Sequence, residues 1–76
     1  MLMMDEFNRI AIDPAVMLGQ PVVRGTRLPV YVIVEAIAAG DTKDDLLAAY
    51  PFLVPEDIDQ ALRFTARMSH LGLEVA

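Results

Sequence analysis

The sequence predicts a mainly α-helical domain, a bundle of three helices preceded by a short N-terminal β-strand or ribbon. Residues 1–29 hold short apolar pieces interrupted by proline and glycine, a composition that favours strands and turns over helix. Residues 30–72 instead carry apolar side chains at helical spacing, in three separate segments. Gly40 and Pro51 stand between those segments, and both residue types commonly end helices.

The length of 76 residues limits the chain to one domain, which we expect to cover residues 1–76. Within it, we expect an arm of strand and loop at 9–29 and a three-helix body at 30–72. An apolar fraction of 55% is high for so short a chain, because small domains bury a limited share of their surface. A second copy that covers apolar surface would account for this fraction, so we expect a homodimer.

Two short apolar segments in the arm predict the ribbon. Residues 7–12 place isoleucines at alternate positions, which is typical of a half-buried strand, and Asp13-Pro14 then turns the chain. Residues 15–18 fit either one helical turn or an extended link. Residues 21–23 predict a second short strand, because proline is tolerated at the first position of a strand.

The loop at 19–30 is the most constrained part of the sequence. Its prolines exclude helix on both sides, and Gly25 permits backbone angles that other residues avoid. Arg24 and Arg27 could contact phosphates, the DNA minor groove or an acidic partner surface, or they could pair with a nearby acid or cap backbone carbonyls. We weigh these interpretations equally. Thr26, between the two arginines, fits a turn-stabilising hydroxyl.

The segment Val30–Ala39 predicts the first helix, which Gly40 ends. Apolar residues surround this helix and Glu35 is its only charge, so we expect a buried helix in the core, at a dimer interface, or both. The candidate dimer interface joins apolar residues of this helix and of the ribbon: Ile10, Ile12, Val22, Tyr31 and Val32.

Capping signals mark the starts of the second and third helices. Thr42 is a good N-cap for the second helix, and Asp45 stands three residues later in the position of a capping-box acid. A proline stops this helix, and the apolar linker 51–54 is expected to pack down. Pro55 suits the first position of the third helix, which we expect to end near Gly72.

The net charge of −5 is concentrated in the middle of the chain, where residues 35–62 hold seven acids and one lysine. A nucleic-acid-binding domain usually shows a basic surface, which this composition lacks. The acids at the helix starts fit helix capping and compensation of the helix dipole, and they could also meet a basic cleft on a partner. The candidate partner-binding residues are Asp44, Asp45, Glu56 and Asp57.

No constellation of residues points to catalysis. The chain has no cysteine and one histidine, His70, which fits a surface residue late in a helix. It carries no Ser-His-Asp arrangement, phosphate-binding glycine loop or metal-binding motif, so we expect no enzymatic activity, no cofactor and no metal. No apolar run approaches the roughly 20 residues of a membrane span, and we expect a cytoplasmic protein.

Three helices with short connections favour a helix-turn-helix, in which the third helix would read DNA. Acids in or near its first turn would repel phosphates: Glu56, Asp57 and Asp59. Gln60 and Arg63 could contact bases if those acids point away, or the three helices could be a scaffold only. The candidate DNA-binding residues are therefore Arg24, Thr26, Arg27, Gln60 and Arg63.

Four motifs follow one another in a specific order: Ile12-Asp13-Pro14, then Gly19-x-Pro21-x-Val23-x-Gly25-Thr26-Arg27-x-Pro29-Val30, then Tyr50-Pro51 and Pro55-Glu56-Asp57-Ile58. Over residues 9–65 the sequence resembles the domain of unknown function 433 family. The resemblance implies a homeodomain-like three-helix fold with short N-terminal strands. It also implies a VapB-like antitoxin of a type II toxin–antitoxin system, partnered by a PIN-like ribonuclease encoded beside it, and it assigns no catalytic residue.

Two positions depart from the family pattern. Leu18 stands where a glycine is common, and Val54 stands where serine or threonine often caps the third helix. Loss of such a cap costs about 1 kcal/mol.

The resulting hypothesis is a homodimeric antitoxin that neutralises the ribonuclease and represses its own operon by binding DNA. The alternatives are a stand-alone helix-turn-helix transcriptional regulator and a small dimeric interaction module.

Overall fold

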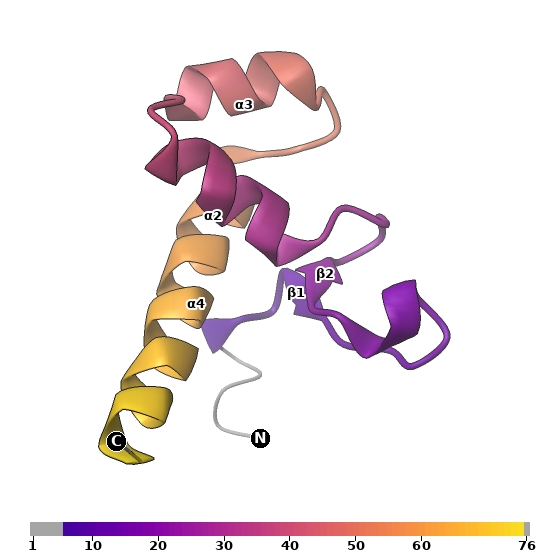
Figure 1. The fold of residues 1–76 in the computed structure, drawn as a ribbon. Helices are drawn as coiled ribbons and strands as arrows, with labels where there is room; N and C mark the ends of the chain where they lie inside the picture. The colour runs from indigo at the N-terminus through magenta and orange to yellow at the C-terminus, as the bar shows by residue number, and fades with distance from the viewer. Residues whose placement is uncertain (1–5, 76) are drawn as a thin grey trace.

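A long C-terminal helix, α4 (Pro55–Val75), is the element against which the rest of the chain packs (Figure 1). The computed structural model describes the backbone of residues 6–75 and the side chains of residues 6–70. Within them, a two-stranded ribbon and three helices confirm the predicted fold class. In order, the elements before α4 are β1 (Ile10–Ala11), the 3₁₀ turn η1 (Met17–Gly19), β2 (Val22–Val23), α2 (Val30–Ala38) and α3 (Lys43–Ala49).

The ribbon is short, and its register brings apolar residues to the core. β1 pairs antiparallel with β2, with Ile10 opposite Val23. The chain then turns back, so that Val23 donates its N–H to the Leu28 carbonyl at 3.0 Å and Pro29 forms a bridge with Val22. Two isolated strands are marginal in water, and packing against α4 supplies the surface that this ribbon needs.

Helix α2 is less buried than its composition predicts. It crosses α4 in the front of the view, and Ile33 is fully buried at their contact (Figure 1). Tyr31, one of the helix's apolar residues, is 50% exposed, and Ala38 is exposed as well. One face of α2 is therefore buried in the core as predicted, and burial of the exposed face at a dimer interface stays a prediction. Gly40 follows the helix at φ 109°, a left-handed conformation that glycine adopts readily.

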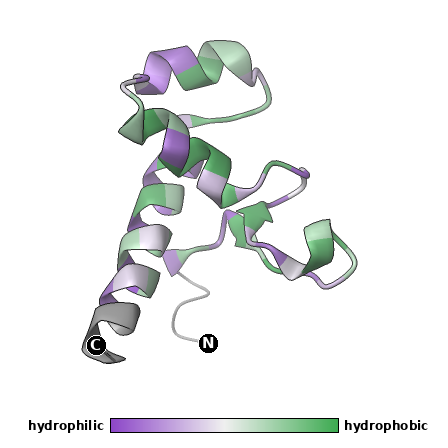
Figure 2. Cartoon of the chain, in the orientation of Figure 1, coloured by the Kyte–Doolittle hydropathy of each residue, from purple (hydrophilic) through white to green (hydrophobic). Residues whose placement is uncertain are grey.

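Helix α3 begins with the predicted capping box. The Thr42 hydroxyl accepts the Asp45 N–H at 3.1 Å, and the Asp45 carboxylate accepts the Thr42 N–H at 2.9 Å. Figure 2 shows the result in colour: the first turn of α3 is hydrophilic and its end is hydrophobic. The hydrophobic end carries Leu46, which is buried against the core.

Helix α4 differs from expectation at both ends. Val54 offers no side-chain cap, but the Asp57 carboxylate accepts the Val54 N–H at 2.9 Å and so supplies half of a capping box. At the other end, the helix continues through Gly72 to Val75. The predicted end near Gly72 is wrong, since a glycine inside a helix costs about 1 kcal/mol but leaves its hydrogen bonds intact.

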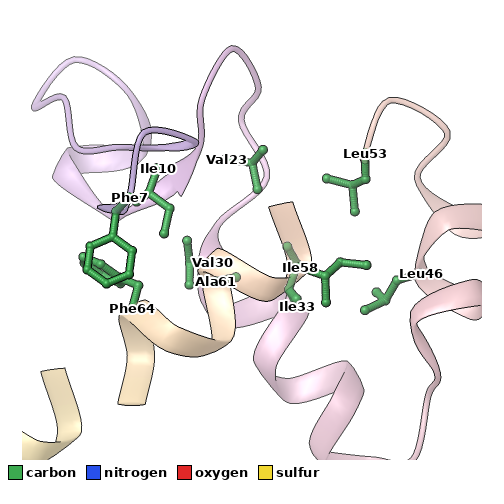
Figure 3. Packing of buried hydrophobic residues seen from close by; sticks show 10 residues of the cluster. All are labelled: Phe7, Ile10, Val23, Val30, Ile33, Leu46, Leu53, Ile58, Ala61 and Phe64. Atoms are coloured by element: carbon green, nitrogen blue, oxygen red, sulfur yellow. The ribbon is translucent and has the colours of Figure 1, made fainter. Parts of the chain in front are cut away.

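The core lies where the ribbon, α2, α3 and the α3–α4 linker meet α4. Its buried apolar residues are Phe7, Ile10, Val23, Val30, Ile33, Leu46, Leu53, Ile58, Ala61 and Phe64 (Figure 3). Phe7 and Phe64 pack edge to face with ring centroids 5.4 Å apart, so the segment just before β1 packs against α4. None of the described helices has the length and apolar character needed to span a membrane.

The turn η1 holds Leu18 in an unfavourable conformation. Met17, Leu18 and Gly19 all have positive φ, of 51°, 58° and 85°. Residues other than glycine are destabilised by roughly 1–2 kcal/mol in this left-handed conformation. The Leu18 side chain is 97% exposed, so no packing offsets the strain. This geometry suits glycine, the residue that the family resemblance places at this position.

Replacing Leu18 with glycine is expected to raise the free energy of unfolding by about 0.5–1 kcal/mol, since the strain relieved exceeds the extra freedom of glycine in the unfolded chain. Urea denaturation of the purified protein measures the change. The control is Ala48→Gly in the exposed part of α3, which is expected to lower stability by about 1 kcal/mol. A loss of stability in Leu18→Gly similar to that of the control would contradict the assigned strain.

Candidate binding groove

An open, mostly apolar groove of about 1030 Å³ lies between residues 11–16 of the arm, the loop at residues 24–28 and the linker at residues 50–52. The loop and the linker project on the same side of α2 (Figure 1). Val16, Val22 and Leu28 contribute to the apolar lining of the groove. Several residues of the family motifs therefore meet here, although they lie far apart in sequence.

Internal hydrogen bonds hold the loop in shape. The Thr26 hydroxyl donates to the Val23 carbonyl at 2.8 Å and accepts the Leu28 N–H at 2.9 Å. Gly25 has φ 81°, which permits the tight turn. Thr26 therefore stabilises the loop. As a DNA-binding candidate it is not supported, because its hydroxyl proton is already donated within the loop.

Arg24 and Arg27 both line the groove, but they are held differently. Arg24 Nε donates to the Asn8 carbonyl at 2.6 Å, and one terminal nitrogen lies 3.4 Å from the Ile10 carbonyl oxygen. Arg24 thus joins the loop to residues 8–10, while its side chain stays exposed. Arg27 is exposed and makes no hydrogen bond or ion pair to any described residue.

The other cationic side chains are all paired with carboxylates. Among the described residues these ion pairs are Arg9–Asp57, Lys43–Asp59, Arg63–Glu56 and Arg67–Glu6. The last two pairs lie on the surface, at 3.2 and 2.9 Å. Within the described part of the chain, the two cations without a carboxylate partner are thus the two that line the groove.

The linker contributes an aromatic wall that the sequence analysis did not predict. Tyr50 and Phe52 lie with ring centroids 6.0 Å apart, and Phe52 is 55% exposed. Leu53 packs into the core as expected, whereas Phe52 and Val54 face outward. The Leu53 N–H donates to the Tyr50 carbonyl at 2.9 Å, so residues 50–53 form a turn with Pro51 and Phe52 at its tip. Proline is favoured at the second position of such a turn, and Pro51 is therefore the signal that could have predicted an exposed phenylalanine.

Gln60 is a structural residue and not a base-reading one. Gln60 is only 3% exposed. Its side-chain oxygen Oε1 accepts the backbone N–H of Arg9 at 2.8 Å. Its side-chain nitrogen Nε2 donates to the side chains of Asn8 and Glu56, at 2.8 and 3.0 Å. The bonds to Arg9 and Asn8 join the N-terminal segment to α4, and the bond to Glu56 lies within α4. The candidate DNA-binding role of Gln60 is therefore wrong in this fold, because the amide is buried and its hydrogen bonds are satisfied.

Asp57 is buried beside Gln60, so its candidate role in contacting a partner is also wrong. Its carboxylate accepts Arg9 Nε at 2.5 Å as well as the Val54 N–H. The hydrogen bond to Asp57 and the negative charge of that carboxylate raise the pKa of Arg9, which remains protonated. The sequence separation of 48 residues between Arg9 and Asp57 hides this pair from local pattern analysis.

The remaining charged candidates lie on the surface. Asp44 and Asp45 are exposed at the start of α3, where Asp45 also serves the capping box. Glu56 is exposed in the first turn of α4 and pairs with Arg63, which is exposed as well. These four residues are accessible to a partner, and their roles stay predictions.

The candidate dimer residues divide into two groups. Ile10 and Val22 are buried in the core of the monomer, so their assignment to a subunit interface is wrong. Ile12 and Tyr31 are exposed, and Val32 is half-buried. Ile10 is buried because β1 packs against α4, whereas Val22 lies between its strand partner Ala11 and the bridge to Pro29.

Comparisons with known proteins agree with this fold. The sequence profile of a family described as "Protein of unknown function (DUF433)" matches residues 10–65. An uncharacterized protein of Sinorhizobium fredii, y4eO, is 43% identical over 49 residues, which cover 64% of this chain and 22% of that protein. The chain thus spans about a fifth of the length of that relative.

A solved structure is similar over nearly the whole chain. It is the crystal structure of a DUF433 member protein from Anabaena variabilis, which is 33% identical, with a TM-score of 0.79. The alignment covers 92% of this chain and 69% of that one. With the profile match over residues 10–65 and the shared fold, the chain belongs to the DUF433 family.

Proposed function

We propose that this protein is an antitoxin that binds and neutralises a PIN-like ribonuclease and has no catalytic activity of its own. The observation that carries the proposal is the open groove, with an exposed aromatic ring and two arginines that have no carboxylate partner in the part of the chain that the structure describes. Aromatic and arginine side chains are enriched at the centres of protein–protein interfaces. Several of the residues by which the sequence resembles antitoxins, Gly25-Thr26-Arg27 and Tyr50, line this groove.

The exposed carboxylates supply a second contact in the proposal. Asp44 and Glu56 lie on the surface at the starts of α3 and α4. A ribonuclease needs a basic cleft to hold RNA, and electrostatic complementarity would favour carboxylates facing that cleft. Asp57 has no part in this contact, since it is buried.

Repression of its own operon, as a homodimer, is the second part of the proposal. The start of α4 is poorly suited to binding DNA, because the exposed Glu56 carboxylate would repel phosphates and Gln60 is buried. Arg24 and Arg27 at the rim of the groove are the better phosphate contacts. The same rim favours the second candidate function, a stand-alone DNA-binding regulator without a toxin partner.

The test is co-expression with the ribonuclease encoded beside this gene. We expect a complex that survives size-exclusion chromatography and a ribonuclease activity that falls to background at equimolar antitoxin. Asp44→Asn with Glu56→Gln is expected to weaken the complex about tenfold at low salt and less at high salt. Glu35→Gln, an exposed acid on α2, is the matched control and should leave affinity unchanged.

Other outcomes separate the two candidate functions. A ribonuclease that stays fully active in excess antitoxin would refute neutralisation. If that result were combined with a salt-sensitive gel shift of the promoter fragment, it would favour the stand-alone regulator. A gel shift that is absent at every salt concentration would remove the DNA-binding part of the proposal.

A further inference from the structure

The charge and the lining of the groove together select one class of occupant. We infer that the groove holds a segment of the partner protein that presents an apolar side chain next to one or two carboxylates. The inference rests on the proposed function, because it assigns to the groove the contact that an antitoxin makes with its toxin. It also adds a chemistry for the partner's side of that contact.

First, positive charge without a carboxylate partner among the described residues is gathered at the groove. Carboxylates neutralise four of the six cations, and the two that have no carboxylate partner among the described residues both line one groove of a protein with net charge −5. A guanidinium group beside an apolar surface binds a carboxylate through two parallel hydrogen bonds. The groove therefore attracts a small number of negative charges at short range.

The second step is the number of charges that the groove can accept. A nucleic acid brings one phosphate per nucleotide, and its affinity grows with the number of phosphates that are neutralised. Here two arginines are available, Asp13 lines the same groove, and the rest of the protein is acidic. A chain of phosphates running through the groove would meet more repulsion than attraction, whereas one or two carboxylates on a protein segment match the two arginines.

The third step is the apolar lining. Val22 and Leu28 contribute apolar surface, and the Tyr50–Phe52 pair contributes two rings in an arrangement tilted by 60°. Such a surface takes up an aliphatic or aromatic side chain, which the hydrophobic effect drives into it. Phe52 is more than half exposed in the free chain, so an occupant would remove a large apolar surface from water.

The fourth step is the preorganisation of one arginine. Arg24 is already anchored by its bonds to the Asn8 and Ile10 carbonyls, and its remaining donors are free to meet an acceptor. A side chain that is fixed before binding loses less conformational entropy on association. Arg27 is not anchored in this way, so it can adjust to the position of the second carboxylate.

The experiment uses the complex with the adjacent PIN-like ribonuclease and two pairs of matched variants. Phe52→Ala is compared with Tyr31→Ala, because these rings are 55% and 50% exposed and Tyr31 lies outside the groove. Arg27→Glu is compared with Arg67→Glu, because both arginines are exposed and Arg67 lies outside the groove. Arg24 stays unchanged since it holds the arm, and circular dichroism checks that each variant is folded.

We expect Phe52→Ala and Arg27→Glu each to weaken the complex at least tenfold by calorimetry, and the two controls to change it less than threefold. Arg27→Gln should fall between wild type and Arg27→Glu. If wild type forms a complex that the groove variants leave intact, the inference is wrong and the proposed function stands. If wild type forms no complex, the proposed function itself fails.

A labelled single-stranded oligonucleotide and a labelled promoter duplex test the nucleic-acid alternative at about 150 mM salt. We expect both to bind at least tenfold more weakly than the ribonuclease. Binding of either nucleic acid that Phe52→Ala and Arg27→Glu abolish, with the ribonuclease complex intact, would overturn the inference in favour of a nucleic-acid groove.

Discussion

Replacing Arg9 with methionine is expected to lower the free energy of unfolding by about 2–3 kcal/mol. The change leaves the buried Asp57 carboxylate without its cationic partner. Breaking a buried ion pair from one side costs about 3–5 kcal/mol, and the value is discounted here because the Arg9 side chain is 39% exposed and water screens it. Urea denaturation followed by circular dichroism measures the loss.

Two further variants show whether the buried charge is the cause. Arg63→Met removes an ion pair with Glu56 that is exposed on both sides, and it should cost less than about 1 kcal/mol. The double variant Arg9→Met with Asp57→Leu removes both charges and is expected to be more stable than Arg9→Met alone. Equal losses in the Arg9 and Arg63 variants would show that the pair has no special role.

Replacing Ile33 with alanine is expected to lower the free energy of unfolding by about 3–4 kcal/mol. Ile33 is fully buried where α2 crosses α4, and truncation leaves a cavity that surrounding side chains fill only in part (Figure 3). Small domains have total stabilities of about 5 kcal/mol at the lower end of the usual range, so a measurable fraction of this variant is unfolded at room temperature.

Ile12→Ala is the matched control for Ile33→Ala, because Ile12 is 59% exposed. It is expected to change stability by less than about 0.5 kcal/mol. A thermal unfolding midpoint that falls equally in both variants would contradict the assignment of the core. If Ile33→Ala is too unstable to purify, Ile33→Val provides a smaller expected loss of about 1 kcal/mol.

Local signals account for the parts of the fold that were predicted correctly. The Thr42–Asp45 capping box, the proline at the start of α4 and the glycine after α2 act within a few residues. Their physics is contained in a short segment, so the sequence shows it. The alternating isoleucines likewise indicated the strand at Ile10, although not whether it would face the core of the monomer or a second subunit.

The candidate site was predicted only in part. Arg24 and Arg27 were identified from the loop, and both line the groove. Phe52 was missed, because Pro51 was interpreted only as the end of a helix and the apolar linker after it was expected to pack down. Gln60 and Asp57 were assigned to surfaces, although contacts with Arg9, about 50 residues away in sequence, place them in the interior.

By itself, the sequence determined the three helices, the capping box of α3, the ribbon and the constrained arginine loop, since each depends on interactions among neighbouring residues. Only the tertiary structure decided which charges are compensated. Ion pairs such as Arg9–Asp57 and Lys43–Asp59 form between segments that the fold brings together. The same packing leaves Arg24 and Arg27 beside an apolar groove, with no carboxylate partner in residues 6–70, so the candidate binding surface is a property of the folded chain.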